Sequence, residues 1–568
     1  MKSPRTPDNE EPAAERACDF RPVDKGFTEE MALAEAERCL NCKKPFCVEG
    51  CPVNINIPRF IEQIRAKDFG GALDTIREDS MLPAICGRVC PQENQCEGKC
   101  IRGKKSEPVA IGQLERFLGD RPELASTPKM APKNGKKVAV VEKREAGGTC
   151  LNRGCIPTKT LLHSSQIFHD AKHGAHAGIH TDDIRADMTE IFAYKREISQ
   201  KLSSGIESLF KTAKIDFLRG TALITAPGAV RVTDAEGGAN DYTCDDILIA
   251  TGSVPSRPPI PGLEFAMTSD ELLEGCDHLY RSIVIIGGGV IGIEFATFYA
   301  DLGCEVTVIE GMDRLLPNMD KELGQSLALI LKKQGVKVFT NAMVQSVEKT
   351  GEDIAVNFTC KEKSETVSGE AVLCAIGRRP YCDGLFADGL SVEMNRRSIA
   401  VNERYETSIP HIYAIGDVSA KIQLAHVATA QGIACVDLLY GRENHTSMSI
   451  VPSCIYCRPE IAVVGLTEAE AKEAGIAVKV GKHVMFDNAK TLIADPGRCL
   501  MKFVANAETR ELLGAQLMCE HASDMIGGVS QALANHMTVN QFLLAMRPHP
   551  SFEEAMTAAL EDLAQKLG

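Results

Sequence analysis

The sequence predicts an α/β protein that carries a small helical, cysteine-rich region in front and an α+β domain at its end. Eight cysteines fall between residues 39 and 100. Apolar, strand-like runs alternate with helical patterns from about residue 136 to 449, which is typical of a parallel sheet. From about Ile450, the runs at 451–465 and 499–517 predict the strands of the last domain.

Length, charge and cysteine content narrow the class of protein. A chain of 568 residues should form three to five domains. A net charge of −14 argues against a nucleic acid or an anionic membrane as partner. The most apolar window, 282–303, contains several glycines and Glu294, so it does not predict a membrane span. The first 21 residues lack the apolar stretch of a signal peptide, so 22 cysteines predict a reducing, cytoplasmic location.

The front cysteines form two blocks with the spacing of a metal site. They read Cys39-x2-Cys42-x4-Cys47-x3-Cys51-Pro and Cys86-x3-Cys90-Pro-x4-Cys96-x3-Cys100. Thiolates select zinc or iron–sulfur, and the mixed spacings with Cys-Pro favour [4Fe–4S] clusters. Zinc, or clusters with a purely structural role, are the alternatives. The apolar spacing between Ile57 and Leu82 predicts helices between the blocks.

Residues 24–118 resemble the cluster domain of the glutamate synthase small subunit and of dihydropyrimidine dehydrogenase. The runs at 85–93 and 111–116 carry the resemblance. It implies two clusters, one on Cys47, Cys51, Cys96 and Cys100. The other would be held by Cys39, Cys42, Cys90 and the carboxylate of Glu115. Alternatively, Cys86 completes a four-cysteine set and Glu115 is a solvated helix residue.

A complete dinucleotide-binding motif lies at the centre of the chain. An apolar run from Ser282 enters Gly287-x-Gly289-x-x-Gly292, and a second strand ends at Glu310, 23 residues after the first glycine. Such a motif binds a diphosphate at a helix N-terminus and a ribose on the acid. Because Glu310 repels a 2′-phosphate, NAD(H) is predicted over NADP(H), although Arg314 could favour the phosphate. A glycine turn used only for packing is the alternative.

Residues 147–159 place two cysteines five positions apart between glycines and a closing Pro-Thr-Lys. Cys150 and Cys155 suit a redox disulfide at the start of a helix, because the unpaired N–H groups there lower a thiol pKa. One thiol can then face a flavin and the other a substrate. The alternative is a buried cysteine pair without chemistry.

This run resembles the active-site signature of the disulfide-reducing flavoenzymes, and dihydrolipoamide dehydrogenases in particular. The resemblance implies FAD, with Cys155 against the flavin and Cys150 exchanging with a lipoamide-like disulfide, small or protein-bound. It also implies a Lys159–Glu294 ion pair beside the flavin. Further cofactor-binding positions are implied within short motifs spread along the chain: Gly148, Thr149, Thr251, Gly252, Gly377, Gly416 and Asp417.

The C-terminal run at 548–554 resembles the closing His-Pro-Thr-x-x-Glu of the same enzymes. His549 can act as a base towards a thiol, and Glu554 can orient its ring. In the family this dyad reaches the disulfide of the other subunit, which implies a homodimer. Arg547 and Ser551 depart from the family pattern. Cys454 and Cys457 lie three apart on a predicted strand, so we expect buried thiols rather than a disulfide.

The first dinucleotide unit is predicted to be truncated. The run 136–143 supplies one strand, ending in Glu142 for an adenosine ribose, and no Gly-x-Gly-x-x-Gly precedes it between 106 and 137. One hypothesis is a deletion that removed the diphosphate-binding turn and helix, which would weaken FAD binding. Another is that a different segment of the chain fills the gap.

Taken together, these motifs predict electron transfer between NAD(H), FAD and the Cys150–Cys155 disulfide, with the clusters relaying electrons to a partner such as ferredoxin. The alternatives are a subunit feeding NAD(P)H electrons to a synthase-like partner, and a degenerate cluster-bearing subunit. The expected architecture is two Rossmann-like domains, the first truncated, between the helical iron–sulfur domain and an α+β dimerisation domain. The predicted segments are a polar tail (1–23), the cluster domain (24–121), a linker (122–135), the FAD domain (136–275 and 396–449), the NAD domain (276–395) and the dimerisation domain (450–568).

Overall fold

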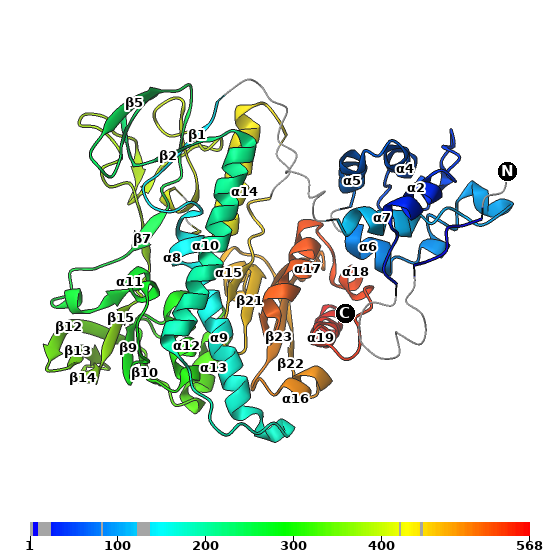
Figure 1. Ribbon diagram of the computed structural model, residues 1–568. Helices are drawn as coiled ribbons and strands as arrows, with labels where there is room; N and C mark the ends of the chain where they lie inside the picture. The colour runs from blue at the N-terminus through cyan, green and yellow to red at the C-terminus, as the bar shows by residue number, and fades with distance from the viewer. Residues whose placement is uncertain (1–3, 10–23, 81–82, 122–136, 420–421, 444–446) are drawn as a thin grey trace. The chain divides into compact units, whose positions relative to one another are not determined.

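The computed structural model describes residues 4–9, 24–80, 83–121, 137–419, 422–443 and 447–568. They fall into two compact units, Met1–Lys137 and Val138–Gly568, each described here by itself (Figure 1). The predicted linker and most of the polar tail lie outside the described residues. Among the described residues no helix is both long enough and apolar enough to cross a lipid bilayer.

The first unit is helical, as predicted. Its helices are α2 (Glu29–Ala36), α3 (Phe46–Glu49), α4 (Ile57–Arg65), α5 (Phe69–Arg77), α6 (Pro83–Val89) and α7 (Ile111–Gly119). The run predicted to be helical from Ile57 forms two helices, because Lys67 has a left-handed φ of 57° and the Asp68 side chain caps α5. Apolar side chains of α4, α5 and α7 form one buried core.

The second unit begins with an α/β region that we call the first α/β segment. Its strands are β1 (Ala139–Glu142), β2 (Asp216–Arg219), β6 (Ile247–Ile249) and β19 (Ile412–Ala414). Its helices are α8 (Gly148–Arg153), α9 (Cys155–His173), α10 (Met188–Ala213) and α14 (Ala425–Leu439). In the described residues these strands form separate two-stranded parallel sheets, β1–β2 and β6–β19.

The second α/β segment is a single five-stranded parallel sheet in the order β11-β10-β9-β15-β8. Its strands are β8 (Met267–Thr268), β9 (Ser282–Ile286), β10 (Glu305–Ile309), β11 (Lys337–Phe339) and β15 (Ala371–Cys374). Its helices are α11 (Ser269–Glu274), α12 (Val290–Leu302) and α13 (Lys321–Lys333). The run at 282–286 forms its central strand, which is buried from Ile283 onward because the sheet is covered on both faces.

Antiparallel hairpin sheets accompany both segments. The first carries β3 (Thr221–Ala226), β4 (Ala229–Thr233) and β5 (Ala239–Thr243), and the second carries β12 (Ala342–Thr350), β13 (Asp353–Cys360) and β14 (Lys363–Gly369). Short pairs join β7 (Ser253–Pro255) to β16 (Arg378–Pro380) and β17 (Met394–Asn395) to β18 (Ser398–Ile399).

The last domain is α+β, as predicted, with an antiparallel sheet in the order β20-β21-β24-β23-β22. Its strands are β20 (Ser453–Ile455), β21 (Ile461–Gly465), β22 (Val478–Val484), β23 (Leu500–Asn506) and β24 (Leu512–Met518). Its helices are α15 (Glu468–Glu473), α16 (Ala489–Ala494), α17 (Ala522–Ala534), α18 (Val539–Leu543) and α19 (Glu554–Leu567).

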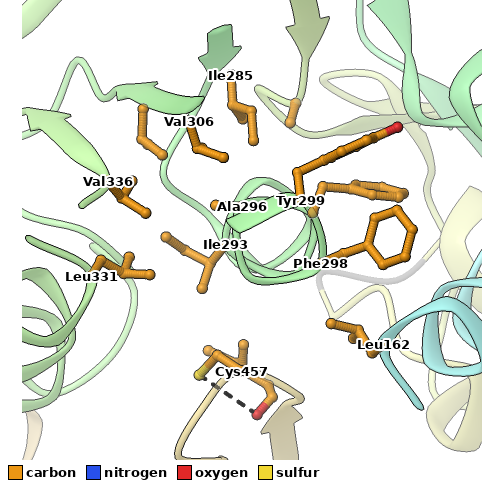
Figure 2. Packing of buried hydrophobic residues seen from close by; sticks show 14 of the residues in the cluster. Leu162, Ile285, Ile293, Ala296, Phe298, Tyr299, Val306, Leu331, Val336 and Cys457 are labelled. Carbon is orange, nitrogen blue, oxygen red and sulfur yellow. Dashed lines mark hydrogen bonds between the residues drawn. The ribbon is translucent and has the colours of Figure 1, made fainter. Parts of the chain in front are cut away.

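One buried cluster runs from the second α/β segment to α9 and to the start of the last domain. Figure 2 shows α12 nearly end-on, with Leu162 of α9 on one side and Cys457 below it. Cys454 and Cys457 are free thiols, and Cys457 is buried with its sulfur 3.2 Å from the Pro459 carbonyl oxygen. Cys454 is only partly buried, so the expectation of buried thiols holds for Cys457 alone of the two.

Candidate active site

The two candidate redox cysteines lie at the junction of α8 and α9. Cys150 is in the middle of the short α8, and Cys155 is the first residue of the 19-residue α9, as expected for a thiol at a helix start. Both thiols are free. A hydrogen bond with Cys150, assisted by the charge of Lys159, lowers the pKa of Cys155 to about 6, and the same hydrogen bond raises the pKa of Cys150. Cys155 is therefore the thiolate at neutral pH, and Cys150 keeps the proton.

Lys159 and Glu294 form the ion pair that the resemblance implies. The Lys159 ammonium lies 2.8 Å from both carboxylate oxygens of Glu294, which is buried near the start of α12. The backbone N–H of Tyr456 donates to the same carboxylate at 3.1 Å, and the ammonium lies 4.7 Å from the Tyr456 ring centroid. No local sequence motif marks Tyr456, because its contact with Glu294 joins segments 162 residues apart.

The glycine motif at 287–292 forms the turn that a dinucleotide needs. Gly287 has a φ of 113°, and a Cβ at Gly292 would lie 2.0 Å from the Gly287 carbonyl oxygen, so both positions require glycine. A Cβ at Gly289 would meet no atom within 4 Å, which leaves open space at the N-terminus of α12. This arrangement can hold a diphosphate.

Glu310 is held at the end of β10 by two backbone N–H groups. The Gly288 N–H donates to its carboxylate at 2.6 Å and the Met312 N–H at 2.7 Å. Arg314, the residue that could have favoured a 2′-phosphate, donates to Asp313 and to the Pro317 carbonyl instead. These contacts fit NAD(H) better than NADP(H).

Gly148 and Thr149 begin α8, and the other predicted cofactor-binding positions lie shortly after the ends of short strands. Gly252, Gly377 and Gly416 all have a left-handed φ, between 70° and 117°. Asp417 accepts a hydrogen bond from the Ser253 hydroxyl at 2.5 Å, and this serine also accepts from the Arg378 guanidinium at 2.9 Å. Thr251 donates to the carbonyl of Tyr381.

The first α/β segment supplies fewer contacts for a dinucleotide. Among the described residues, Glu142 accepts from the Arg144 N–H at 2.8 Å, which matches the Glu310–Met312 contact, but no glycine turn donates to it. The next residue, Lys143, donates to the Tyr381 hydroxyl at 2.6 Å. The described residues therefore fit the flavin end of FAD at Lys159 and Asp417, and among them no glycine N–H donates to Glu142 as Gly288 does to Glu310.

His549 and Glu554 form the predicted dyad at the start of α19. The imidazole Nδ1 lies 2.8 Å from the Glu554 carboxylate, whose second oxygen accepts from the Ser551 N–H at 2.9 Å. That backbone hydrogen bond, followed by the imidazole, lowers the pKa of Glu554. The His549 side chain is 74% exposed, and in the described residues it makes no hydrogen bond to Cys150 or Cys155.

The front cysteines divide into two groups, but not as the resemblance implied. Cys47 and Cys100 line one cavity together with Cys39 and Cys42 rather than with Cys51 and Cys96. Cys51 lies instead close enough to Cys90 and Cys96 for its charge to raise the pKa of both thiols. This grouping differs from the partition that the resemblance implied, because the fold of the first unit brings Cys100 beside the first block and Cys51 beside the second.

Glu115 lies beside the second group. The residue is only 7% exposed, one carboxylate oxygen has no hydrogen-bond partner among the described residues, and burial raises the pKa of the carboxyl to about 7. The alternative that Glu115 is a solvated helix residue is therefore wrong. Cys86 also lies beside Cys90, with its sulfur 3.6 Å from the Ser80 hydroxyl, so both candidates for the eighth ligand stay open.

In the described part of the chain no three His, Cys, Asp or Glu side chains are close enough to hold one metal ion. The ligands of a [4Fe–4S] cluster bind separate iron atoms, so they stand further apart than those of a zinc ion.

Comparison with protein families assigns most of the chain. Residues 125–432 match the pyridine nucleotide-disulphide oxidoreductase model, and residues 451–560 match the dimerisation domain of that family. Residues 16–126 match the model for dihydropyrimidine dehydrogenase domain II, 4Fe-4S cluster.

Individual relatives agree. A dihydrolipoyl dehydrogenase of Bacillus subtilis is 38% identical over 440 residues, covering 75% of this chain and 92% of the relative. A dihydrolipoamide dehydrogenase of Chaetomium thermophilum is 36% identical, covering 76% and 86%.

Solved structures are similar over the same region. LpdA of Mycobacterium tuberculosis has a TM-score of 0.69 at 26% identity, covering 75% of this chain and 93% of that one. The HOCl-induced flavoprotein disulfide reductase RclA of Escherichia coli has a TM-score of 0.66 at 28% identity, covering 76% and 95%. The chain belongs to the pyridine nucleotide-disulphide oxidoreductase family, with a 4Fe-4S domain fused to its N-terminus.

Proposed function

We propose that the protein is an NAD(H)-dependent flavoprotein disulfide oxidoreductase of the dihydrolipoyl dehydrogenase type. The observation that carries the proposal is the acidic Cys155 thiol at the start of α9, hydrogen-bonded to Cys150 and next to the Lys159–Glu294 pair. When bound, FAD would accept the hydride of NADH and pass the electron pair to the Cys150–Cys155 disulfide. Lys159 and Asp417 would hold its flavin end, and the turn at Gly289 would hold NAD(H).

The reduced dithiol then reduces the substrate by thiol–disulfide exchange. Cys150 loses its proton, attacks one sulfur of a lipoamide-like disulfide and releases the other as a thiolate. Cys155 next attacks the Cys150 sulfur, which releases the second substrate thiolate and re-forms the Cys150–Cys155 disulfide. Because Cys150 holds the proton, the exchange needs a base, and we assign that role to His549 with Glu554 as its orienting partner.

We infer that the base comes from a second subunit. The dyad is exposed in one chain, and Leu544 and Met546, five and three residues before His549, are 85% and 97% exposed. Apolar side chains this exposed favour an interface. A homodimer would bury them and bring His549 of one chain to Cys150 of the other.

For the first unit we propose two [4Fe–4S] clusters. One would be held by Cys39, Cys42, Cys47 and Cys100, and the other by Cys51, Cys90 and Cys96 with either Glu115 or Cys86. The buried carboxylate oxygen of Glu115, which has no hydrogen-bond partner in the part of the chain that the structure describes, supports Glu115 as the ligand. The clusters would relay electrons between the flavoprotein and a partner such as ferredoxin, and the cysteine content supports a reducing, cytoplasmic location.

We also propose that the first α/β segment is a truncated dinucleotide domain. In the second segment, β10 pairs with the strand that leads into the glycine turn, whereas β1 pairs with β2 in the described residues. The missing unit would be the strand, turn and helix that cradle the FAD diphosphate. We therefore expect weak FAD binding, with a flavin-to-protein ratio well below one after gel filtration. A ratio near one would overturn the truncation proposal.

Cys150→Ser tests the disulfide mechanism. The variant should lose NADH-dependent lipoamide reduction by at least about a thousandfold, because no exchange thiol remains, while NADH-dependent dye reduction persists. Cys244→Ser, an exposed cysteine outside the site, is the matched control and should keep both activities.

Two other outcomes would favour a different function. Lipoamide reduction that survives Cys150→Ser contradicts the proposed mechanism. The parent protein could instead reduce a dye but not lipoamide, and contain its full iron and sulfide in an anaerobic assay. That result would favour an electron-transfer subunit as the function.

A further inference from the structure

The two helices that carry the candidate redox residues, α9 and α12, pack against each other, and two acidic side chains of α12 point to α9. Glu294 and Asp301 are seven residues apart, so they lie two turns apart on one face of the helix. Both are buried. Glu294 pairs with Lys159, and Asp301 accepts from the Ser165 hydroxyl at 3.2 Å. Each acid thus binds one residue of α9.

The same two acids bind one short segment of the last domain. Directly after β20, the Tyr456 N–H donates to Glu294 at 3.1 Å, and the Arg458 guanidinium donates to Asp301 at 2.6 Å. Between these contacts, Leu162 and Cys457 face α12 in Figure 2 and belong to one buried cluster. Residues 456–458 therefore run along α12, and their apolar contact through Cys457 lies between the two polar contacts.

Arg458 also reaches α9 directly. Its second terminal nitrogen lies 2.8 Å from Nδ1 of His169 and 3.2 Å from the Asp170 carboxylate. Burial raises the pKa of Asp301, and the charge of Arg458 opposes that rise. Removing one partner of such a buried pair leaves an uncompensated charge. One guanidinium thus joins α9, α12 and the last domain.

We propose that Asp301 and Arg458 are positioning residues for the redox centre. They set the register of α9 against α12, and through it the place of Lys159 between Glu294 and Cys155. Neither residue touches a thiol. The groups that face Cys155 are the protonated Cys150 thiol and the charged Lys159 and Glu294, of which Lys159 favours the thiolate and Glu294 opposes it. A small shift between the two helices therefore changes the charge balance at Cys155. The inference rests on the proposed role of Cys155.

The test measures alkylation of Cys155 against pH in the full chain. Trypsin cuts after Arg153 and Lys159, so Cys155 is the only cysteine of its peptide, and mass spectrometry follows it alone. In Arg458→Gln and Asp301→Asn, loss of the register should raise the alkylation midpoint by about one pH unit and slow alkylation at pH 6 about fivefold. Arg458→Lys should recover part of the shift.

Lys502→Gln is the matched control. Lys502 of β23 pairs with the buried Asp320 at the N-terminus of α13 at 2.7 Å, so its loss breaks a buried ion pair between the same domains away from α9. This control should lower the melting temperature without moving the midpoint.

The inference is overturned if the Cys155 alkylation midpoint stays at the parent value in Arg458→Gln and Asp301→Asn while their melting temperatures fall as in the control. A parent midpoint near the ordinary thiol value of about 8.5 would instead remove the basis of the proposed function, and this inference with it.

Discussion

In the second α/β segment, the Gly288 N–H lies in the turn between β9 and α12 and donates to the carboxylate of Glu310, which directly follows β10. In the first, Glu142 ends β1 and accepts, among the described residues, from Arg144 alone. The neighbouring helices differ as well. Ten of the 13 residues of α12 are buried, but only three of the 15 residues of α14. Leu248 of β6 is 40% and Ile433 of α14 is 55% exposed.

The difference in burial between α12 and α14 indicates how the strand, turn and helix of a dinucleotide-binding unit contribute to the packing of their own domain. The strand, turn and helix that bind a diphosphate are also the layer that covers the neighbouring strand and helix. On the proposed truncation the first α/β segment lacks that layer, which would account for the exposure of Leu248 and Ile433. The proposed truncation therefore links the loss of the ligand contact to the loss of packing.

The largest effect expected from this comparison is on stability. Phe298→Ala in α12 should lower the free energy of unfolding by about 3–5 kcal/mol, because the ring is buried in a filled core. Ile433→Ala in α14 should lower it by less than about 0.5 kcal/mol, because the side chain already faces solvent. Urea unfolding of both variants measures the two values. A loss of about 2 kcal/mol or more in Ile433→Ala would show that α14 is covered and would break the comparison.

An intermediate effect, on the Kd for NADH, is expected from substitutions of Glu310 and Glu142. Glu310→Gln should raise the Kd for NADH about tenfold or more, because a neutral acceptor holds the Gly288 and Met312 N–H groups less well. Glu142→Gln is the matched change and should leave the NADH Kd within about twofold. Fluorescence titration with NADH gives both values, and similar losses in the two variants would contradict the assignment of NAD(H) to the second segment.

The smallest effect concerns pH. The Cys155 pKa of about 6 lies below the ordinary thiol value, so the thiolate is lost as pH falls through 6 and is complete above about pH 7. Cys304 of the second α/β segment is buried, and burial raises its pKa to about 12. Alkylation of Cys155 should therefore rise with a midpoint near pH 6, while Cys304 stays unmodified below pH 8. Equal reactivity of the two cysteines at pH 6 would contradict this ordering.

Short-range patterns explain which parts of the site the sequence predicted. Gly287, Gly292 and Glu310 lie within 24 residues of one another, and a strand, a turn and a helix must join them in one way. The same holds for Cys150 and Cys155, and for His549 with Glu554. Each set forms a local unit whose geometry follows from backbone sterics and capping.

The sequence did not predict the contacts between distant segments. Tyr456 reaches Glu294 across 162 positions, and Arg458 reaches Asp301 across 157, with no local motif to mark either contact. The grouping of the front cysteines has the same cause, because four thiols around one cavity come from both blocks of the first unit.

By itself the sequence determined the family, the glycine motif for NAD(H), the candidate redox cysteines and the absence of a Gly-x-Gly-x-x-Gly motif between residues 106 and 137. Only the tertiary structure decided which cysteines lie together, that Glu115 is buried, and how the segment 456–458 joins α9 to α12. The physical reason is that backbone conformation and capping act over a few residues, whereas burial and ion pairing depend on which distant segments the core brings together.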